Sequence, residues 1–320
     1  MNYDVSLIFA TYNGEHTLNR LFDSLQKQQN IDDLKWNIIV VDNSSTDKTP
    51  DIINHYQSSL PIIAKSENKQ GKNAALNNAI SDLEQLGDLV IISDDDVVFS
   101  ENFIYTYYKM TQNCDGYDVF GGTIQPLWEQ EPTPELMKGI PLSPAFALNN
   151  TNASGEISPC GIFGPNMAVR KSIFTSGITF NEAIGPKGKN YPMGSETEFL
   201  TRLKNKGYKA YFFSEVIVEH IVRKWQFEQK WLNNRAYKAG RGAVYYQIVG
   251  NDFEPNVKSI CGYPRWALLR VLKIYVKLLW IKWFKRKDKV YEYKTRWNLN
   301  FYIGYTNEFK KAKGQHLNLQ

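Results

Sequence analysis

Three consecutive aspartates, Asp94, Asp95 and Asp96, are the first residues whose types and spacing suggest chemistry. They follow the apolar run Leu89–Ile92, which is typical of a strand covered on both faces. Adjacent carboxylates repel one another, and each is costly to desolvate without a partner. Alternate side chains of an extended chain point the same way, so Asp94 and Asp96 can converge on a divalent cation while Asp95 faces elsewhere. A solvated acidic turn is the other interpretation of these three residues alone.

Polar segments also follow three earlier predicted strands. Strands are expected at residues 5–10, 36–42 and 60–64, and the segments TYNG, DNSS and SENKQGK come directly after them. Helical spacing of the apolar residues between these strands predicts a largely parallel sheet with helices on both faces. Ligands of such sheets bind at the carboxyl ends of the strands, so the four polar segments predict a binding cleft there.

The later part of the chain adds fewer elements. A short strand is expected in NMAVRK, and ETEFLTRLKNKGY predicts a helix with Glu196 in its first turn. AYFFSEVIVEH predicts one or two strands ending at His220, and a helix is expected in RKWQFEQKWLNNRAYKAGRGAVYYQ. The single segment GKNAALNNAISDLEQL is expected to be one helix.

Composition limits the class of protein. The 320 residues can form one large α/β domain, or one domain with an appendage, and 42% hydrophobic with 22% charged residues is typical of a folded protein. Three widely spaced cysteines predict neither a disulfide framework nor a zinc site, and they favour a reducing, cytoplasmic environment. The N-terminus predicts a strand rather than a signal peptide, and no apolar run approaches the length of a membrane span.

Several blocks of sequence follow one another through most of the first 240 residues. They read VSLIFATYNGEHTL, NIIVVDNSSTDKT, GKNAALNNAI, LVIISDDDVVFSENFI, VFGGTIQPLWEQEPTPELM, GIFGPNMAVRKSIF, FNEAIGPKGKNYPMGSETEFLTRLKNKGY and VIVEHIV. Together they resemble family 2 glycosyltransferases, which transfer a sugar from a nucleotide diphosphate. The resemblance implies the GT-A fold, an α/β fold whose Rossmann-like, mostly parallel sheet is flanked by helices.

The resemblance also implies a division of the chain. A catalytic domain is expected at residues 1–240, with a nucleotide-sugar-binding half at 1–125 and an acceptor half at 126–240. A helical, basic and aromatic tail is expected at 241–320.

A metal ion follows from the chemistry of this transfer. The leaving nucleotide diphosphate carries two or three negative charges, which Mn²⁺ or Mg²⁺ can neutralise. The resemblance implies that Asp94 and Asp96 form the family's Asp-x-Asp motif and hold this ion, with His220 as a further ligand. A structural role is the alternative for a lone histidine. Asp95 is expected either to bind the ribose or a sugar hydroxyl, or to be a local turn carboxylate.

The first two expected strands are followed by candidate nucleoside-binding residues. The resemblance implies that Thr11, Tyr12 and Asn13 line the pocket, with Tyr12 packing on the base. Asp42 and Asn43 are also expected among the nucleotide-sugar-binding residues, with Asp42 accepting a hydrogen bond from a uracil ring. Uridine diphosphate is favoured over guanosine or thymidine diphosphate only by the resemblance.

Two of these assignments have a plain alternative. Asp42 could instead cap the following helix, unless Ser44, Ser45 or Thr46 does so. Lys72, at an expected helix start, suits a phosphate or a base carbonyl, because a helix N-terminus with a cation is a sound anion site. A solvated lysine is the alternative there.

The acceptor hydroxyl needs a base, and the resemblance implies a carboxylate in a Gly-Glu-Asp-like motif. The motif here reads GSETEF, so Ser195 and Glu196 stand where a Glu-Asp pair is usual. Glu196 is therefore the expected base, with Glu198 as the alternative, and the reaction is expected to be a direct displacement with inversion. Without spanning helices or a Gln-x-x-Arg-Trp motif, a single sugar addition is favoured over processive synthesis.

Two other functions compete with this interpretation. The sequence VIISDDDVV also matches the Asp-x-Asp-x-Val signature of phosphatases of the haloacid dehalogenase type, but later acidic residues in their pattern are missing. A non-catalytic protein that binds a nucleotide sugar or a glycan is the other alternative, and the departure in GSETEF favours it.

The C-terminal tail is strongly basic. Residues 261–320 hold 14 Lys and Arg against 3 Asp and Glu, whereas the remainder holds 24 against 30. A helix at 264–287 is expected either to lie in the membrane interface, with its tryptophans near the headgroups, or to dock on the catalytic domain. Its broad apolar face argues against nucleic acid.

The expected partners follow from the resemblance and the tail. They are a nucleotide-sugar donor, a glycan or lipid-linked acceptor, and the inner face of the cell membrane as a peripheral contact. Exposed aromatic residues near the C-terminus would equally suit a homodimer.

Overall fold

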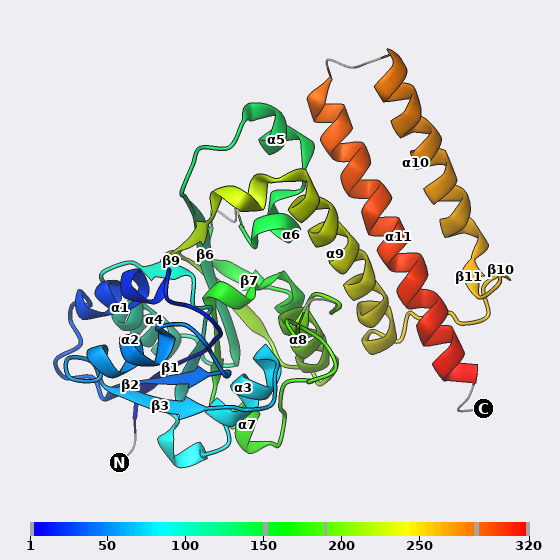
Figure 1. The fold of residues 1–320 in the computed structure, drawn as a ribbon. Coiled ribbons are helices and arrows are strands. Elements are labelled where there is room, and N and C mark those ends of the chain that lie inside the picture. The colour runs from blue at the N-terminus through cyan, green and yellow to red at the C-terminus, as the bar shows by residue number, and fades with distance from the viewer. Residues whose placement is uncertain (1–2, 150–152, 189–190, 285–287, 318–320) are drawn as a thin grey trace. The chain divides into compact units, whose positions relative to one another are not determined.

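The computed structural model describes residues 3–149, 153–188, 191–284 and 288–317 (Figure 1). They form two compact units. The first consists of residues 1–127, 147–189 and 195–221, and the second of 128–146, 190–194 and 222–320. The second unit begins before residue 240 because α9 packs along α11. The functional division of the chain at that residue stays a prediction.

The first unit is built on a sheet with the strand order β3–β2–β1–β4–β8–β6–β9–β5, and β7 pairs with β9. The strands β1 to β4 are parallel, and antiparallel pairs complete the sheet. This arrangement confirms the expected α/β class. The strands are β1 (Val5–Thr11), β2 (Trp36–Asp42), β3 (Ile62–Ser66), β4 (Leu89–Ile92), β5 (Val97–Phe99), β6 (Val119–Trp128), β7 (Gly155–Ile157), β8 (Met167–Arg170) and β9 (Ala210–Val222).

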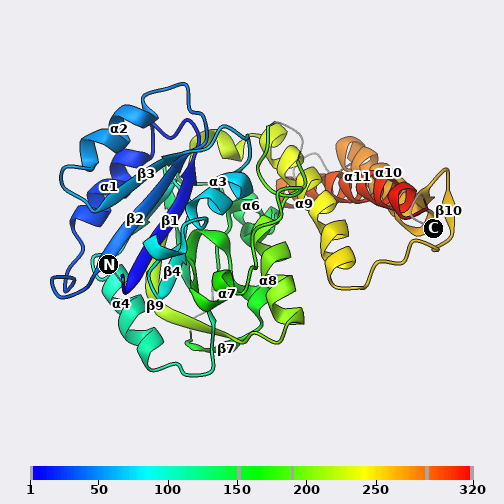
Figure 2. The same cartoon turned by 90° about the horizontal axis from the view of Figure 1, so that it is seen from below.

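Helices cover both faces of the sheet (Figure 2) because successive residues of its strands point to opposite sides. In β1, Phe9 packs against Phe22 of α1, with ring centroids 6.1 Å apart, whereas Ile8 belongs to the core under α3 and α8. The helices of this unit are α1 (Leu18–Gln26), α2 (Thr49–Tyr56), α3 (Lys72–Ala79), α4 (Phe103–Gln112), α7 (Ser172–Thr175) and α8 (Ser195–Asn205), with 3₁₀ turns at Leu83–Gln85, Pro159–Gly161 and Gly164–Asn166.

Two expected elements differ in extent. The single helix expected after Gly71 ends at Ala79, and a separate 3₁₀ turn follows because the Asp82 carboxylate accepts the Glu84 backbone N–H at 3.1 Å. The one or two strands expected before His220 are the single long strand β9, which continues to Val222.

The second unit is mainly helical. Helix α11 packs against α9 on one side and α10 on the other (Figure 1). Their shared core contains Val244, Ala267, Tyr305 and Phe309, and a buried ion pair joins Arg241 to Glu308 at 2.6 Å. The elements are α5 (Pro134–Gly139), α6 (Leu142–Phe146), α9 (Gln229–Val249), α10 (Arg265–Phe284) and α11 (Lys289–Leu317), a 3₁₀ turn at Lys224–Phe227, and the short strands β10 (Ser259–Ile260) and β11 (Tyr263–Pro264).

The tail helices do not reach the apolar length of a membrane span. Among the described residues, no helix has a stretch both long enough and apolar enough to cross a bilayer.

Glycines allow α9 and α11 to approach closely. A Cβ at Gly304 would lie 2.0 Å from the Tyr237 carbonyl oxygen, whereas a Cβ at Gly314 in the same helix meets nothing within 4 Å. We therefore expect Gly304→Ala to lower the free energy of unfolding by about 2 kcal/mol, through overpacking of the helix contact.

Gly314→Ala is the matched control. It should leave stability unchanged or raise it by up to about 1 kcal/mol, because alanine favours helix more than glycine does. Denaturant unfolding of both variants measures the difference, and equal stability of the two would contradict the close helix contact.

Candidate active site

The three aspartates after β4 point to three different partners. Asp95 and Asp96 form a bend between β4 and β5, so the extended geometry expected for the three aspartates was wrong. Asp94 contacts Lys72, Asp95 Oδ2 accepts the Thr11 hydroxyl at 2.6 Å, and Asp96 Oδ1 lies 3.3 Å from His220 Nε2. Each of the three carboxylates thus has a different partner among these contacts.

Lys72 joins two carboxylates that are far apart in the sequence. Its Nζ donates to Asp94 Oδ1 and to Glu196 Oε1. Only 14% of the Lys72 side chain is exposed, against 25% for Asp94 and 20% for Glu196, so the three charges interact with little screening by water. This contact brings the aspartate bend and the expected base together.

These contacts shift the pKa of each group. Burial raises the pKa of Glu196, but the Lys72 ammonium outweighs it and holds that pKa at about 2. Burial also raises the pKa of Asp94, and there it exceeds the opposing effect of Lys72. Burial lowers the pKa of Lys72, but the two carboxylates raise it by more, so the pKa lies above its ordinary value. Glu196 is thus an ionised carboxylate at neutral pH, as a proton acceptor must be.

The first turn of α8 places Glu196 closely against the backbone of another segment. A Cβ at Gly164 would lie 2.6 Å from Glu196 Cγ, so a larger residue there would displace the Glu196 side chain. Gly71, just before α3, has a φ of 137°, which favours glycine, and the Lys72 backbone N–H donates to the Pro186 carbonyl at 2.9 Å. Local backbone constraints thus place both partners of the ion pair.

The β5–β9 pairing positions Asp96 beside His220. Val97 is the register partner of His220, and the Ile221 N–H donates to the Asp96 carbonyl at 2.8 Å. A carboxylate and an imidazole suit Mn²⁺, which substrate phosphates commonly help to hold. Within the part of the chain that the structure describes, no three His, Cys, Asp or Glu side chains form a group that could hold an ion. An ion at these two side chains would need further ligands, such as substrate oxygens.

The loops after β1 and β2 are joined by hydrogen bonds. The Asn13 side-chain oxygen accepts the Thr46 N–H at 2.9 Å, and the Asn13 N–H donates to Ser45 Oγ at 2.9 Å. Asn13 has a φ of 54°, which asparagine tolerates better than most residues. Tyr12, beside it, is 52% exposed, as a residue that is to pack on a ligand would be.

Asp42 does not cap a helix. Its Oδ1 accepts the Ser45 N–H at 3.0 Å, whereas α2 begins at Thr49, whose N–H donates to Asp47 at 3.0 Å. The helix-cap alternative for Asp42 was wrong, and so was the expectation that one of the three residues Ser44 to Thr46 would be the cap. Contact of Asp42 with a base stays a prediction.

Asn43 is a buried support for the next loop. Its Nδ2 donates to the carbonyls of Glu67 and Lys69, both at 2.9 Å, and its Oδ1 accepts the Gly71 N–H at 2.7 Å. The side chain expected among the nucleotide-binding residues thus fixes the segment that leads to Lys72.

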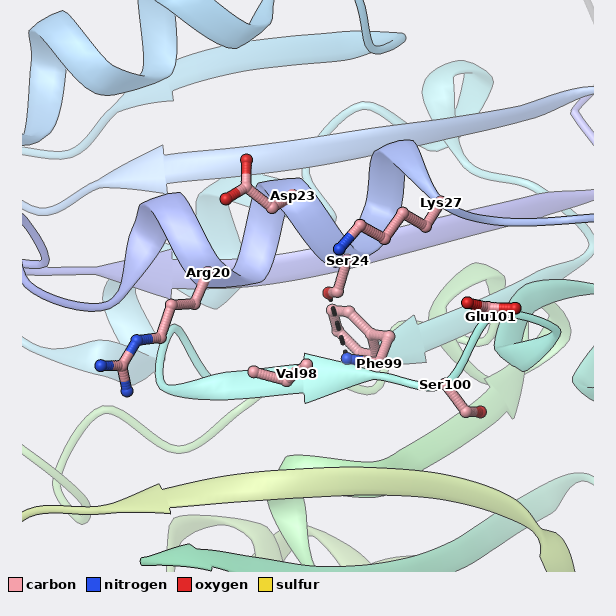
Figure 3. A pocket seen from close by; sticks show the side chains of 8 residues that line it. All are labelled: Arg20, Asp23, Ser24, Lys27, Val98, Phe99, Ser100 and Glu101. Carbon is pink, nitrogen blue, oxygen red and sulfur yellow. Dashed lines mark hydrogen bonds between the residues drawn. The ribbon is translucent and has the colours of Figure 1, made fainter. Parts of the chain in front are cut away.

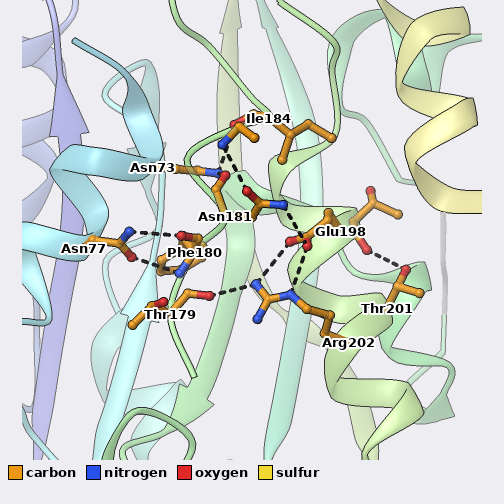
Figure 4. A network of polar contacts seen from close by, with 11 residues as sticks. Asn73, Asn77, Thr179, Phe180, Asn181, Ile184, Glu198, Thr201 and Arg202 are labelled. Carbon is orange, nitrogen blue, oxygen red and sulfur yellow. Dashed lines mark hydrogen bonds and ion pairs between the residues drawn. The ribbon is translucent and has the colours of Figure 1, made fainter. Parts of the chain in front are cut away.

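Glu198 forms hydrogen bonds that hold the loop before α8, and it is not directed into open solvent (Figure 4). It accepts from Arg202 at 3.0 and 3.1 Å and from Asn181 at 3.2 Å, and Arg202 also donates to the Thr179 carbonyl at 2.7 Å. With its side chain 3% exposed and these donors around it, Glu198 supports the loop, which favours Glu196 as the base.

Two asparagines of α3 hold the same loop from the other side. Asn73 donates to the carbonyls of Asn181 and Ile184, and Asn77 both donates to the Phe180 carbonyl and accepts its N–H (Figure 4). These positions were missed from the sequence, although asparagines at i and i+4 share one face of a helix.

A hollow of about 390 Å³ lies along α1 and β5, away from these groups (Figure 3). None of the expected site residues lines it. Its lining residues are Arg20, Asp23, Ser24, Lys27, Val98, Phe99, Ser100 and Glu101.

Comparison with known proteins decides the family. Residues 6–174, more than half of the chain, match the model of the family described as Glycosyl transferase family 2. The chain belongs to glycosyl transferase family 2. This membership confirms the resemblance, and the phosphatase alternative was wrong.

One relative of this family 2 chain matches most of its length. It is 22% identical over 293 residues to the O-antigen chain rhamnosyltransferase WbaN of Salmonella anatum, a match that covers 87% of this chain and 88% of WbaN.

Two solved structures share its fold. The mannosyltransferase PcManGT of Pyrobaculum calidifontis, in complex with GDP-Man and Mn²⁺, matches with a TM-score of 0.56 and 17% identity, covering 100% of this chain and 81% of that one. Residues 1–349 of S. aureus TarS match with a TM-score of 0.52 and 17% identity, covering 100% and 92%. These likenesses confirm the expected GT-A fold.

Removal of the lysine charge tests the ion-pair bridge. We expect Lys72→Met to lower the free energy of unfolding at pH 7 by about 3 kcal/mol, because it leaves two partly buried carboxylates without their cation. Without Lys72 the carboxyl pKa values of the folded protein rise above those of the unfolded chain. Folding then takes up protons, so the loss of stability should shrink as the pH falls from 7 to 5.

Denaturant unfolding at both pH values measures this change. The matched control is Lys69→Met, which removes a lysine whose side chain is 63% exposed and paired with Glu182, and which should change stability little. A Lys72→Met protein as stable as the unsubstituted one at pH 7 would exclude the bridge as a buried interaction.

Proposed function

We propose that this chain is an inverting glycosyltransferase that moves one sugar from a nucleotide diphosphate sugar to a hydroxyl of a glycan or lipid-linked acceptor. The observation that carries the proposal is the Lys72 bridge, which holds Asp94 of the aspartate bend and Glu196 of α8 on one side chain. This contact supports a single site that contains the proposed donor-binding residues and the proposed base.

Glu196 is the proposed base. Its carboxylate takes the proton from the acceptor hydroxyl as that oxygen attacks the anomeric carbon of the donor sugar. The bond from this carbon to the phosphate oxygen breaks, and the nucleotide diphosphate leaves with the bonding electrons. One carboxylate suffices for this displacement, which inverts the anomeric carbon and forms no covalent enzyme intermediate.

Asp96 and His220 are the proposed holders of Mn²⁺ or Mg²⁺, together with diphosphate oxygens, and Asp94 stays a predicted third ligand. When bound, the ion supplies positive charge that stabilises the leaving diphosphate. Lys72 holds the Asp94 and Glu196 side chains in place and adds a further positive charge beside them.

The nucleoside is proposed to lie over the loops after β1 and β2. Thr11, Tyr12 and Asn13 would line this pocket, and Asp42 would accept a base N–H. Asp95, which Thr11 holds through a hydrogen bond, would contact the ribose or a sugar hydroxyl. A uridine nucleotide is proposed, and the solved structure of TarS with UDP supports this choice.

The acceptor is proposed to belong to a surface polysaccharide or glycoconjugate. The name of the relative WbaN, an O-antigen chain rhamnosyltransferase, supports this class of product. A non-catalytic binding protein of the same fold remains the second candidate, because the Lys72 ammonium pairs with the expected base and lowers its pKa, which weakens it as a proton acceptor.

Titration calorimetry with UDP, GDP and TDP tests the donor site. We expect one nucleotide to bind, more tightly with Mn²⁺ than without, and we expect Asp96→Ala to lose the metal-dependent part. The control Asp88→Ala removes an exposed carboxylate directly before the first residue of β4, at the end of the strand far from the aspartates. This variant should bind nucleotide as the unsubstituted protein does. Absence of binding by all three nucleotides would exclude the proposed site.

Substitution of the base separates catalysis from binding. Glu196→Gln should keep nucleotide affinity within about threefold and lower turnover by about 10²- to 10⁴-fold, the usual contribution of a positioned base. Release of nucleotide diphosphate from a donor–acceptor pair measures turnover. Equal turnover of Glu196→Gln and unsubstituted protein would reject Glu196 as the base, and nucleotide binding without any transfer would favour the non-catalytic candidate.

A further inference from the structure

Helix α10 exposes an apolar stripe along its whole length. Leu269, Leu272, Val276, Leu279 and Trp283 recur at alternating spacings of three and four residues, which places them on one face of the helix. Their exposed fractions lie between 40% and 80%, so the stripe is open in the folded second unit. Exposed apolar patches of this extent mark interaction surfaces.

The opposite face of α10 is buried against α11. Ala267, Leu278 and Ile281 are at most 7% exposed, and α10 packs against α11 on this side. Figure 1 shows the two helices side by side, with α10 at the outer edge of the three long helices. The stripe is thus a second apolar face, separate from the one that folds the unit.

Basic side chains form a row beside the stripe. Arg270, Lys273 and Lys277 follow one another at helical spacing, and Arg270 and Lys277 lie over the rings of Tyr302 and Tyr291 of α11, at 4.8 and 4.4 Å from the ring centroids. The segment Arg265–Phe284 contains five Lys and Arg and no Asp or Glu. The charge next to the stripe is therefore of a single sign.

We propose that the outward face of α10 binds the surface of an anionic lipid bilayer. The apolar stripe enters the boundary between headgroups and acyl chains, and the basic row contacts lipid phosphates. Trp283, at the C-terminal end of the helix, is 80% exposed and suits the headgroup region, where indole rings concentrate in membrane proteins.

The charges favour lipid over a second copy of this chain. The three-four spacing would also fit a helix pair, and the positions flanking such a seam include Lys273, with no acidic residue anywhere in α10 to face it on a partner. A pair of α10 helices would bring like charges together, whereas an anionic bilayer neutralises them.

Vesicle sedimentation with the full chain tests the proposal. We expect the protein to pellet with vesicles of phosphatidylcholine and phosphatidylglycerol, and about tenfold less with phosphatidylcholine alone or in 0.5 M salt, because salt screens the lysine–lipid attraction. Leu272→Ser with Val276→Ser should weaken binding to the anionic vesicles at least tenfold, since it removes exposed apolar surface.

Matched variants show whether vesicle binding depends on the stripe or on exposed apolar side chains in general. Ile248→Ser with Ile260→Ser removes two other exposed apolar side chains of the same unit and should bind as the unsubstituted protein does. Lys273→Glu should weaken binding roughly tenfold, whereas Lys204→Glu, an equal change of charge at an exposed position of α8, should not.

Several results would overturn the proposal. They are no pelleting with anionic vesicles, pelleting that the α10 variants leave unchanged, and a dimer in light scattering that Leu272→Ser with Val276→Ser converts to a monomer without any vesicle binding. Nucleotide affinity of the same variants, measured by calorimetry, should be unchanged, because the stripe contains none of the proposed donor or catalytic residues. Failure of the membrane proposal and failure of the proposed function can therefore be told apart.

Discussion

The contact of Lys72 with two carboxylates is the interaction on which the site depends. Three partly buried charges of alternating sign stabilise one another, and any one of them alone would be costly in this position. The lysine opens α3, one carboxylate follows β4, and the other opens α8, so the ion pairs join segments that are far apart in the chain. Much of the surrounding backbone, including Gly71 and Gly164, is shaped to let these three side chains meet.

The sequence predicted the framework of this site well, because the framework depends on local patterns. The run Leu89–Ile92 and the segment Trp36–Asp42 are strands with the expected bounds, and Glu196 lies in the first turn of a helix as expected. Apolar periodicity and strand-end polarity are sufficient for such predictions. The family resemblance then named Lys72, Asp94 and Glu196, which the structure brings into contact.

Pairings between distant residues could not be predicted in this way. Nothing in the order of residues indicates that Lys72 lies on Glu196, that Thr11 binds Asp95, or that Glu198 is occupied by Arg202. Those contacts depend on how helices α3 and α8 pack on the sheet, which local patterns leave open. The bend at Asp95 and Asp96 was likewise missed, because three aspartates fit an extended segment as well as a bend.

The asparagines at the ends of β1 and β2 have a consequence for ligand binding. Asn13 and Asn43 tie the loops after the first strands to one another and to the segment before α3, through backbone groups on each side. These loops lose their conformational freedom when the protein folds rather than when a ligand arrives. A ligand that meets them finds donors and acceptors already oriented, so its binding entropy carries little cost of loop ordering, and its affinity reports the contacts themselves.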